Sequence, residues 1–283
     1  MNHARSEVHH SPGRYRDGST EPILLLHPFL LSQSVWKYVA PQLADTGRYE
    51  VFAPTMADHN GGPRGPFLLD VAHLADDIER RLDEIGWTTA HIVGNSLGGW
   101  VAFELERRGR ARTLTGIAPA GGWTRFTPAK YEIIAKFVAG LPIVVITKLL
   151  GQRVHRLPFT RQISYVAVAA TADSLSDGDR RDLIDDVAHC PAYHKLMLKS
   201  LTTAGLMELP NSCTPTHLVI CEKDRVLPHP RFTRHFVENL PANAEITHLD
   251  GVGHVPMFEA PGRITGLITE FVDRHTEQGR AAG

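Results

Sequence analysis

Hydrophobic positions along this chain fall into short continuous runs that are separated by longer amphipathic stretches. The short runs cover residues 23–26, 51–54, 90–93, 113–118, 216–221 and 244–249. Residues 68–85 instead carry apolar side chains at helical spacing, which predicts an amphipathic helix. Strands that alternate with helices are typical of parallel strands joined by helical crossovers. We therefore predict an α/β protein with a mostly parallel central sheet flanked by helices.

The alternation stops near residue 122 and resumes at residue 216, and the pattern between them is helical only. Ligands bind beyond the carboxyl ends of the strands in open α/β sheets, and an insertion at this point of the chain can cover that edge. We predict a core domain of residues 1–122 and 211–283, with a helical cap of residues 123–210.

The longest apolar stretch, residues 131–151, belongs to this predicted cap. Lys136, Lys148, Gly140 and Pro142 interrupt it. A membrane span needs about 20 mostly apolar residues, so we predict no integral membrane segment. We expect two short helices broken at residues 140–142, with apolar faces turned toward an apolar substrate pocket. The alternatives are that these residues only pack the cap or cover the interface of a homodimer.

A glycine-rich hexapeptide, Gly-Asn-Ser-Leu-Gly-Gly, occupies residues 94–99, directly after the run at 90–93. The residues that follow predict a helix, so Ser96 is placed on a sharp turn from strand to helix. Small neighbours let the strand and the helix approach each other, and the turn exposes the serine hydroxyl. We predict that Ser96 is a nucleophile and that the Leu97 N–H, at the start of the helix, binds an oxyanion.

A serine nucleophile needs a base and an acid that orients the base. His254 follows the run at 244–249 in a glycine-containing loop, and histidine titrates near neutrality, as a general base requires. Asp224 lies just past the end of the run at 216–221 and would hold the histidine in one tautomer. Glu222 is a rival acid, but Asp224 is adjacent to an apolar segment that would anchor it.

These motifs resemble those of the α/β-hydrolase family. The order Ser, Asp, His along the chain is the family's order, and the resemblance extends from about residue 23 to about residue 271. It implies a second oxyanion donor in the loop after the first strand, where the family usually has His-Gly-X. This chain has Pro28 in place of the glycine. Proline has no N–H, so the resemblance assigns the second donor to Phe29.

The resemblance implies a hydrolase that cleaves an ester or related acyl bond of a small substrate, without metal or cofactor. Serine at position 96 disfavours epoxide and haloalkane hydrolysis, because family members with those activities use aspartate there. Carbon–carbon hydrolases of ring-fission products, cofactor-free haloperoxidases or perhydrolases, and acyltransferases are alternatives with the same triad. The carbon–carbon hydrolases would need a cationic group in the cap, for which Arg153, Arg156 and Arg161 are candidates. A non-catalytic binding protein is a further alternative.

The composition of the chain limits which classes of partner it can bind and indicates its cellular compartment. The 283 residues are 42% hydrophobic with a net charge of −1, and no basic block indicates nucleic acid. The three cysteines are scattered, and the polar, His-rich amino terminus lacks the apolar segment of a signal peptide. We expect a cytoplasmic protein with a frayed amino terminus that binds no metal. Asp58 and His59 form a potential reactive pair, but turn-forming composition explains them more simply.

Overall fold

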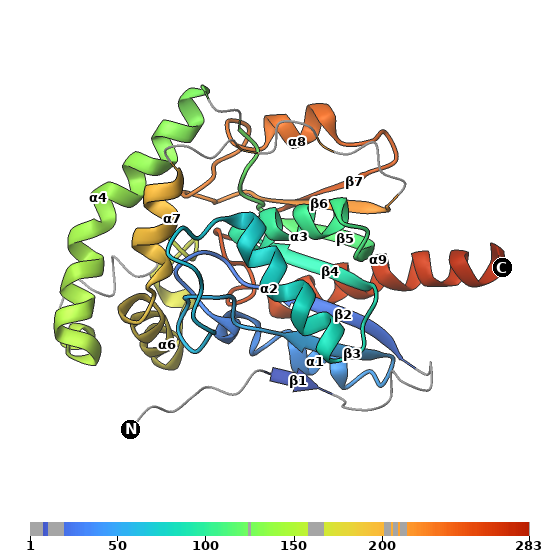
Figure 1. The fold of residues 1–283 in the computed structure, drawn as a ribbon, viewed down its shortest axis with the longest axis horizontal. Helices are drawn as coiled ribbons and strands as arrows, with labels where there is room; N and C mark the ends of the chain where they lie inside the picture. Colours follow the sequence, from blue (N-terminus) through green and yellow to red (C-terminus); the bar gives the residue numbers. More distant parts are fainter. Residues whose placement is uncertain are drawn as a thin grey trace.

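A seven-stranded sheet forms the centre of the molecule in a computed structural model that describes residues 8–10, 20–123, 126–157, 167–200, 205, 209 and 214–282 (Figure 1). The strands are β1 (Val8–His10), β2 (Glu21–Leu26), β3 (Tyr49–Ala53), β4 (Ala90–Asn95), β5 (Ala111–Ile117), β6 (Thr216–Cys221) and β7 (Glu245–Leu249). They lie in the order β1-β3-β2-β4-β5-β6-β7. All neighbours from β3 to β7 pair in parallel, as predicted.

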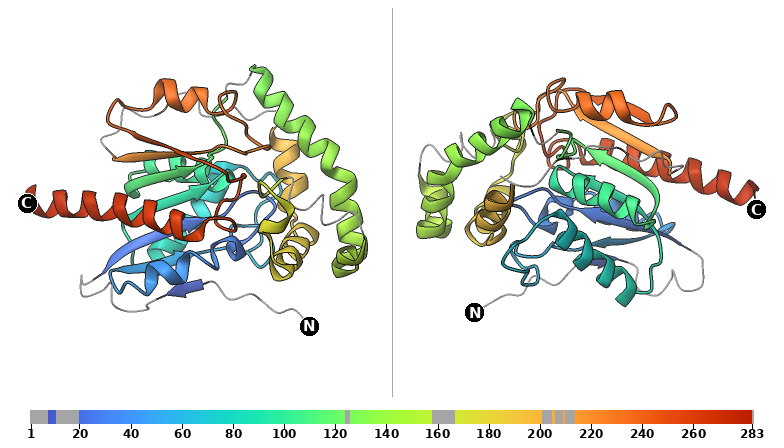
Figure 2. Two further views of the ribbon diagram at one scale, coloured as in Figure 1. Left: turned by 180° about the vertical axis from the view of Figure 1, so that it is seen from behind. Right: turned by 45° about the horizontal axis from the view of Figure 1, so that its top comes forward.

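Helices cover both faces of this sheet (Figure 2). The helices of the core are η2 (Gln33–Trp36), α1 (Ala40–Ala44), α2 (Val71–Glu84), α3 (Leu97–Arg107), α8 (Arg234–Asn239) and α9 (Pro261–Ala282). Alternate side chains of each strand serve opposite faces. Ile23 and Leu25 pack with α1 and α9, whereas Leu24 and Leu26 pack with α2 and α3.

A helical cap is inserted between β5 and β6, as predicted. Its described helices are α4 (Pro128–Leu150), η3 (Gly151–Arg156), η4 (Ala172–Ser174), α6 (Asp177–Ala188) and α7 (Ala192–Ser200). In Figure 1 these helices stand together at one end of the sheet. The domain boundaries stay predictions, because part of residues 201–213 lies outside the described residues.

The expectation of two short helices at residues 131–151 is wrong. The chain instead forms one continuous helix, α4, with Pro142 inside it. A proline costs one main-chain hydrogen bond in a helix interior, and the flanking turns continue despite that loss. The expectation that the apolar faces turn inward is also wrong in part, because many of these side chains are exposed. By length and composition alone, residues 128–155 could cross a membrane.

The expected frayed amino terminus needs one correction. Residues 8–10 form β1, which pairs antiparallel with β3 at the edge of the sheet. His9 and His10 therefore belong to an edge strand, while His3 lies outside the described residues. The pairing uses main-chain groups, which a search for side-chain patterns does not detect.

A buried carboxylate fastens the cap to the core. Asp186 of α6 is 0% exposed and accepts hydrogen bonds from the Ser32 and Ser34 hydroxyls, each at 2.8 Å. The Asn60 amide donates to its other oxygen at 2.9 Å. Asp58 forms a 2.6 Å ion pair with Lys195 of α7. Asp58 thus joins the core to the cap.

Candidate active site

The turn that carries Ser96 is strained and tightly packed. Ser96 has φ 55° and ψ −114°, in the region of positive φ that residues with a side chain rarely adopt. A Cβ atom on Gly94 would lie 2.2 Å from the Gly98 carbonyl oxygen. One on Gly98 would lie 2.3 Å from the Leu26 carbonyl oxygen. These two positions therefore accept only glycine, which explains two of the three glycines of the hexapeptide in physical terms.

His254 and Asp224 form a buried pair. The His254 Nδ1–H donates to the Asp224 Oδ2 at 2.7 Å, and both side chains are nearly inaccessible to solvent. The N–H groups of Val226 and Leu227 each donate to the Asp224 Oδ1 at 2.8 Å. Burial alone would raise the pKa of Asp224, but the charge and hydrogen bond of His254 and the two N–H groups outweigh it and lower the pKa. The carboxylate therefore stays ionised and fixes Nδ1 as the protonated nitrogen of His254.

Glu222, the rival acid, points elsewhere. Its exposed carboxylate pairs with Lys223 at 2.7 Å and accepts from the Gly251 N–H at 2.8 Å. The segment after Asp224 holds the carboxylate through the N–H groups of Val226 and Leu227, whereas the sequence argument named the segment as an anchor without naming these groups.

Asn95 connects the turn of Ser96 to the loop of His254. Its buried amide donates to the carbonyl oxygens of Ile117 and His254, each at 3.0 Å. Within the described residues, no hydrogen bond joins the Ser96 hydroxyl to the His254 ring. Catalytic hydrogen bonds are often long before substrate binds. Sequence reasoning missed the role of Asn95, although its position directly before the candidate nucleophile was the available signal.

A further set of contacts joins the His254 loop to the cap. Glu259 accepts from the Gly253 N–H at 2.6 Å and from the Ala170 N–H at 2.8 Å. The Val255 N–H donates to the Val168 carbonyl at 2.8 Å. The candidate base is therefore held from both the core and the cap.

The loop that carries Phe29 is held by a neutral histidine. His27 Nδ1–H donates to the Pro28 carbonyl at 2.9 Å, and its Nε2 accepts from the Met56 N–H at 2.9 Å. Complete burial, with the nearby charge of His59, lowers the pKa of His27 well below its usual value. Within the described residues, the Phe29 N–H has no acceptor. Leu97 is the first residue of α3, where N–H groups lack an intrahelical partner.

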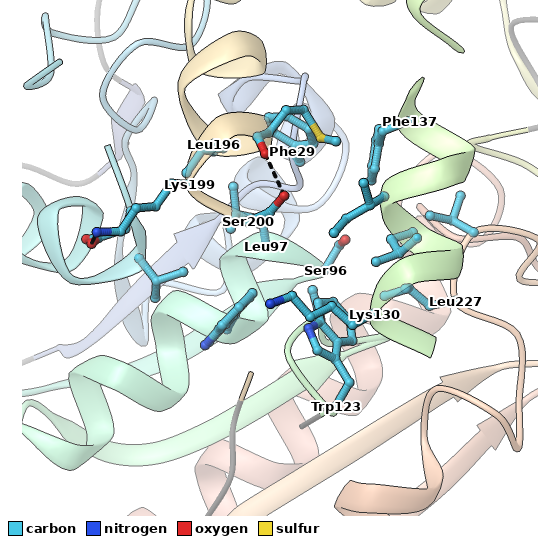
Figure 3. A pocket seen from close by; sticks show the side chains of 18 residues that line it. Phe29, Ser96, Leu97, Trp123, Lys130, Phe137, Leu196, Lys199, Ser200 and Leu227 are labelled. Atoms are coloured by element: carbon cyan, nitrogen blue, oxygen red, sulfur yellow. Dashed lines mark hydrogen bonds and ion pairs between the residues drawn. The ribbon is translucent and has the colours of Figure 1, made fainter. Parts of the chain in front are cut away.

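An apolar cavity of about 780 Å³, counting its open mouth, lies between core and cap above Ser96 (Figure 3). Phe29, Ser96 and Leu97 line it, so the structure brings the predicted nucleophile and both predicted oxyanion donors to one place. The ring of Phe29 packs edge-to-face on Phe137 of α4, with ring centroids 5.0 Å apart. The cap thus closes the cavity with aromatic and aliphatic side chains, as small-molecule sites commonly require.

Two lysines, which the sequence did not single out, line this cavity. Lys130 of α4 is 2% exposed and lines the same cavity as Ser96, and both are labelled in Figure 3. The Nζ atom of Lys199 in α7 lies 3.4 Å from the Oδ2 atom of Asp70.

Of the arginines considered for binding a substrate carboxylate, Arg153 is exposed and does not line the cavity. The Arg156 side chain and Arg161 lie outside the described residues.

Comparison with known proteins identifies the family. Residues 23–266 match the model of the alpha/beta hydrolase family. The chain belongs to this family, and it is a hydrolase.

A curated relative, "Epoxide hydrolase EphH" of Mycobacterium tuberculosis, is 60% identical over 76% of this chain and 100% of its own length. A solved esterase from Thermogutta terrifontis superposes with a TM-score of 0.70 at 18% identity, covering 95% of this chain and 93% of its own. The solved epoxide hydrolase CorEH gives a TM-score of 0.70 at 18% identity, covering 95% and 94% of the two chains. At these identities the two solved structures show a shared fold alone.

Proposed function

We propose that this hydrolase cleaves an ester or related acyl bond of a small apolar substrate through an acyl-enzyme intermediate, with Ser96, His254 and Asp224 as the triad. The observation that carries the proposal is the strained turn that presents the Ser96 hydroxyl to the floor of an apolar cavity. The buried His254–Asp224 pair, tethered through Asn95 to the same turn, supports it.

The geometry suggests a conventional division of work. His254 Nε2 accepts the Ser96 proton while the serine oxygen attacks the substrate carbonyl carbon. The N–H groups of Phe29 and Leu97 stabilise the negative oxygen of the tetrahedral intermediate. His254 then gives its proton to the departing alcohol. A water molecule, deprotonated by the same imidazole, attacks the acyl-enzyme, releasing the acid and restoring the serine.

Epoxide hydrolysis is the second candidate, because the relative EphH bears that name. A carboxylate that opens an epoxide forms an ester, which water can hydrolyse, whereas a serine oxygen would form a stable ether. With Ser96 in this position, turnover of an epoxide requires water activated directly by His254. The two candidates therefore differ in whether Ser96 is bonded to the substrate.

The deciding experiment measures kcat/KM for p-nitrophenyl esters and for styrene oxide with the wild type, Ser96→Ala and His254→Ala. We expect ester turnover in the wild type, and a loss of at least about a thousandfold in both variants, because triad members act as a unit. Epoxide turnover that survives in Ser96→Ala, without ester turnover in the wild type, would establish the second candidate instead.

A further inference from the structure

The outer side of α4 is an apolar surface that no other part of the described protein covers. It consists of Tyr131, Val138, Leu141, Ile143, Val145, Ile146, Leu149 and Leu150, which are between 37% and 78% exposed. In Figures 1 and 2, α4 runs along the outside of the cap. Monomeric proteins rarely expose a large continuous apolar patch unless it binds something.

The inner side of the same helix is fixed to the protein. Ile133 and Phe137 line the cavity, and Val144 is buried. The Tyr193 hydroxyl donates to the Phe137 carbonyl at 2.7 Å, and Lys136 donates to the Val226 carbonyl at 2.9 Å. A helix held in this way cannot cross a bilayer without dismantling the cavity. Its outer side can contact a lipid surface while the helix lies parallel to it.

Basic residues outnumber acidic ones along this helix, whose single acidic residue, Glu132, forms ion pairs with Lys136 and Arg231. Residues 133–172 contain no Asp or Glu, although the whole chain has a net charge of −1. The same segment contains Lys136, Lys148, Arg153, Arg156 and Arg161. The acidic residues of the neighbouring α6 are occupied within the fold, with Asp182 bound to Lys37 and Asp185 to Gln152. Lys148 and Arg153 are exposed at the carboxyl end of the apolar surface.

We propose that the outer side of α4 docks on an anionic membrane surface. Interfacial helices bury an apolar face at the boundary of the acyl chains while their cations meet anionic headgroups. A second copy of the chain fits this surface less well. A two-fold interface sets the same patch against itself, whereas the exposed Lys148 and Arg153 beside the patch complement anionic headgroups. The docking depends on the α4 surface and the cations at its carboxyl end, and it is independent of the chemistry at Ser96.

The test is co-sedimentation of the whole protein with phosphatidylcholine vesicles, prepared with and without phosphatidylglycerol. We expect binding to the anionic vesicles that weakens as salt is added. The double variant Val145→Gln/Leu149→Gln should lower the partition coefficient at least tenfold, since each buried CH₂ is worth about fourfold. Lys148→Gln and Arg153→Gln should each lower it about fivefold.

Val237→Gln is the matched control, because Val237 is an aliphatic residue of α8 that is 43% exposed on another part of the surface. It should leave the partition coefficient unchanged. Light scattering on the same samples reports the second-copy alternative. A dimer that the α4 substitutions dissociate, together with equal sedimentation with and without anionic vesicles, would overturn the proposal. Ser96→Ala should bind as the wild type does, so loss of catalysis leaves this result intact.

Discussion

Individual side chains in the candidate site are held in place by hydrogen bonds to main-chain groups, and these bonds depend on the donors or acceptors that each side chain carries. Asn95 is an example, since only a side chain with two N–H donors can bond both the Ile117 and His254 carbonyls. The Asp224 carboxylate is a second example, because the N–H groups of residues 226 and 227 fix its orientation. The sequence predicted Asp224 from its position after a strand. For Asn95 it offered only a position next to Ser96 and no sign of its partners, because these are carbonyl groups, which every residue carries.

Replacement of Asn95 by Asp should impair catalysis more than substrate binding. The new carboxylate cannot donate to either carbonyl, and an unsatisfied buried polar group costs about 1–3 kcal/mol. We expect kcat to fall at least about tenfold with little change in KM, together with a lower Tm. Asn239→Asp is the control, because the Asn239 side chain is exposed and donates only to His235 of its own helix. A rise in KM at constant kcat would contradict the positioning role.

His59 should make stability fall in mild acid. Burial lowers its pKa to about 4, whereas an unfolded histidine titrates at about 6.5. As the pH falls below 6.5 the unfolded state binds a proton that the folded state refuses, so unfolding becomes easier, until the folded ring also titrates near pH 4. Between pH 7.5 and 5 this amounts to about 2 kcal/mol.

Urea unfolding at these two pH values measures the effect. The His59→Gln variant should show a smaller drop than the wild type by about that amount, while the contribution of His27 remains. An equal drop in both proteins would show that His59 does not carry this pH dependence.

At the scale of elements, the strands and core helices were predictable because their hydrophobic periodicity reflects a sheet buried on both faces. Leu24 and Leu26 serve one face and Ile23 and Leu25 the other. The errors arose where periodicity carries little information. Helix α4 is apolar on nearly all sides, so its pattern does not tell the inner from the outer surface. Pro142 indicated a break. The structure has one helix instead, which packs against α6 and forms one wall of the cavity.

The attachment of α6 to the core depends on Asp186. Asparagine in its place puts an N–H group opposite at least one of the three donors, Ser32, Ser34 and Asn60, so at least one hydrogen bond is lost. Hydrogen bonds to a buried charge are worth about 1.5–3 kcal/mol each. We expect Asp186→Asn to lower the free energy of unfolding by about 2 kcal/mol or more and to raise KM through a looser cap. Asp250→Asn, at an exposed position, is the control. Unchanged stability would show that the cap is held by its other contacts.

For the whole molecule, the arrangement of core and cap sets which substrates can reach Ser96. In the proposed mechanism the core contributes the serine oxygen, the imidazole and the oxyanion donors, and the cap contributes the walls of the cavity. These walls, Ile133 and Phe137 of α4 with Leu196 of α7, are aliphatic or aromatic. The sequence predicted an apolar pocket under this cap from the density of aliphatic residues. It could not tell that Ile146 is exposed and lies outside the cavity, because that follows from the rotation of one helix.

The preference of the enzyme for esters of a given acyl-chain length is a direct test of these cavity walls. Each CH₂ that an acyl chain buries contributes about 0.8 kcal/mol, so kcat/KM should rise from acetyl esters toward longer ones until the cavity is full. Phe137→Ala removes a wall of the cavity and should shift the preferred chain to a greater length, whereas Ile146→Ala should leave the preference unchanged. A preference for acetyl esters in all three proteins would mean that the acyl chain occupies another region. Lys130, a buried lysine that lines the same cavity as Ser96, would then be the next residue to replace.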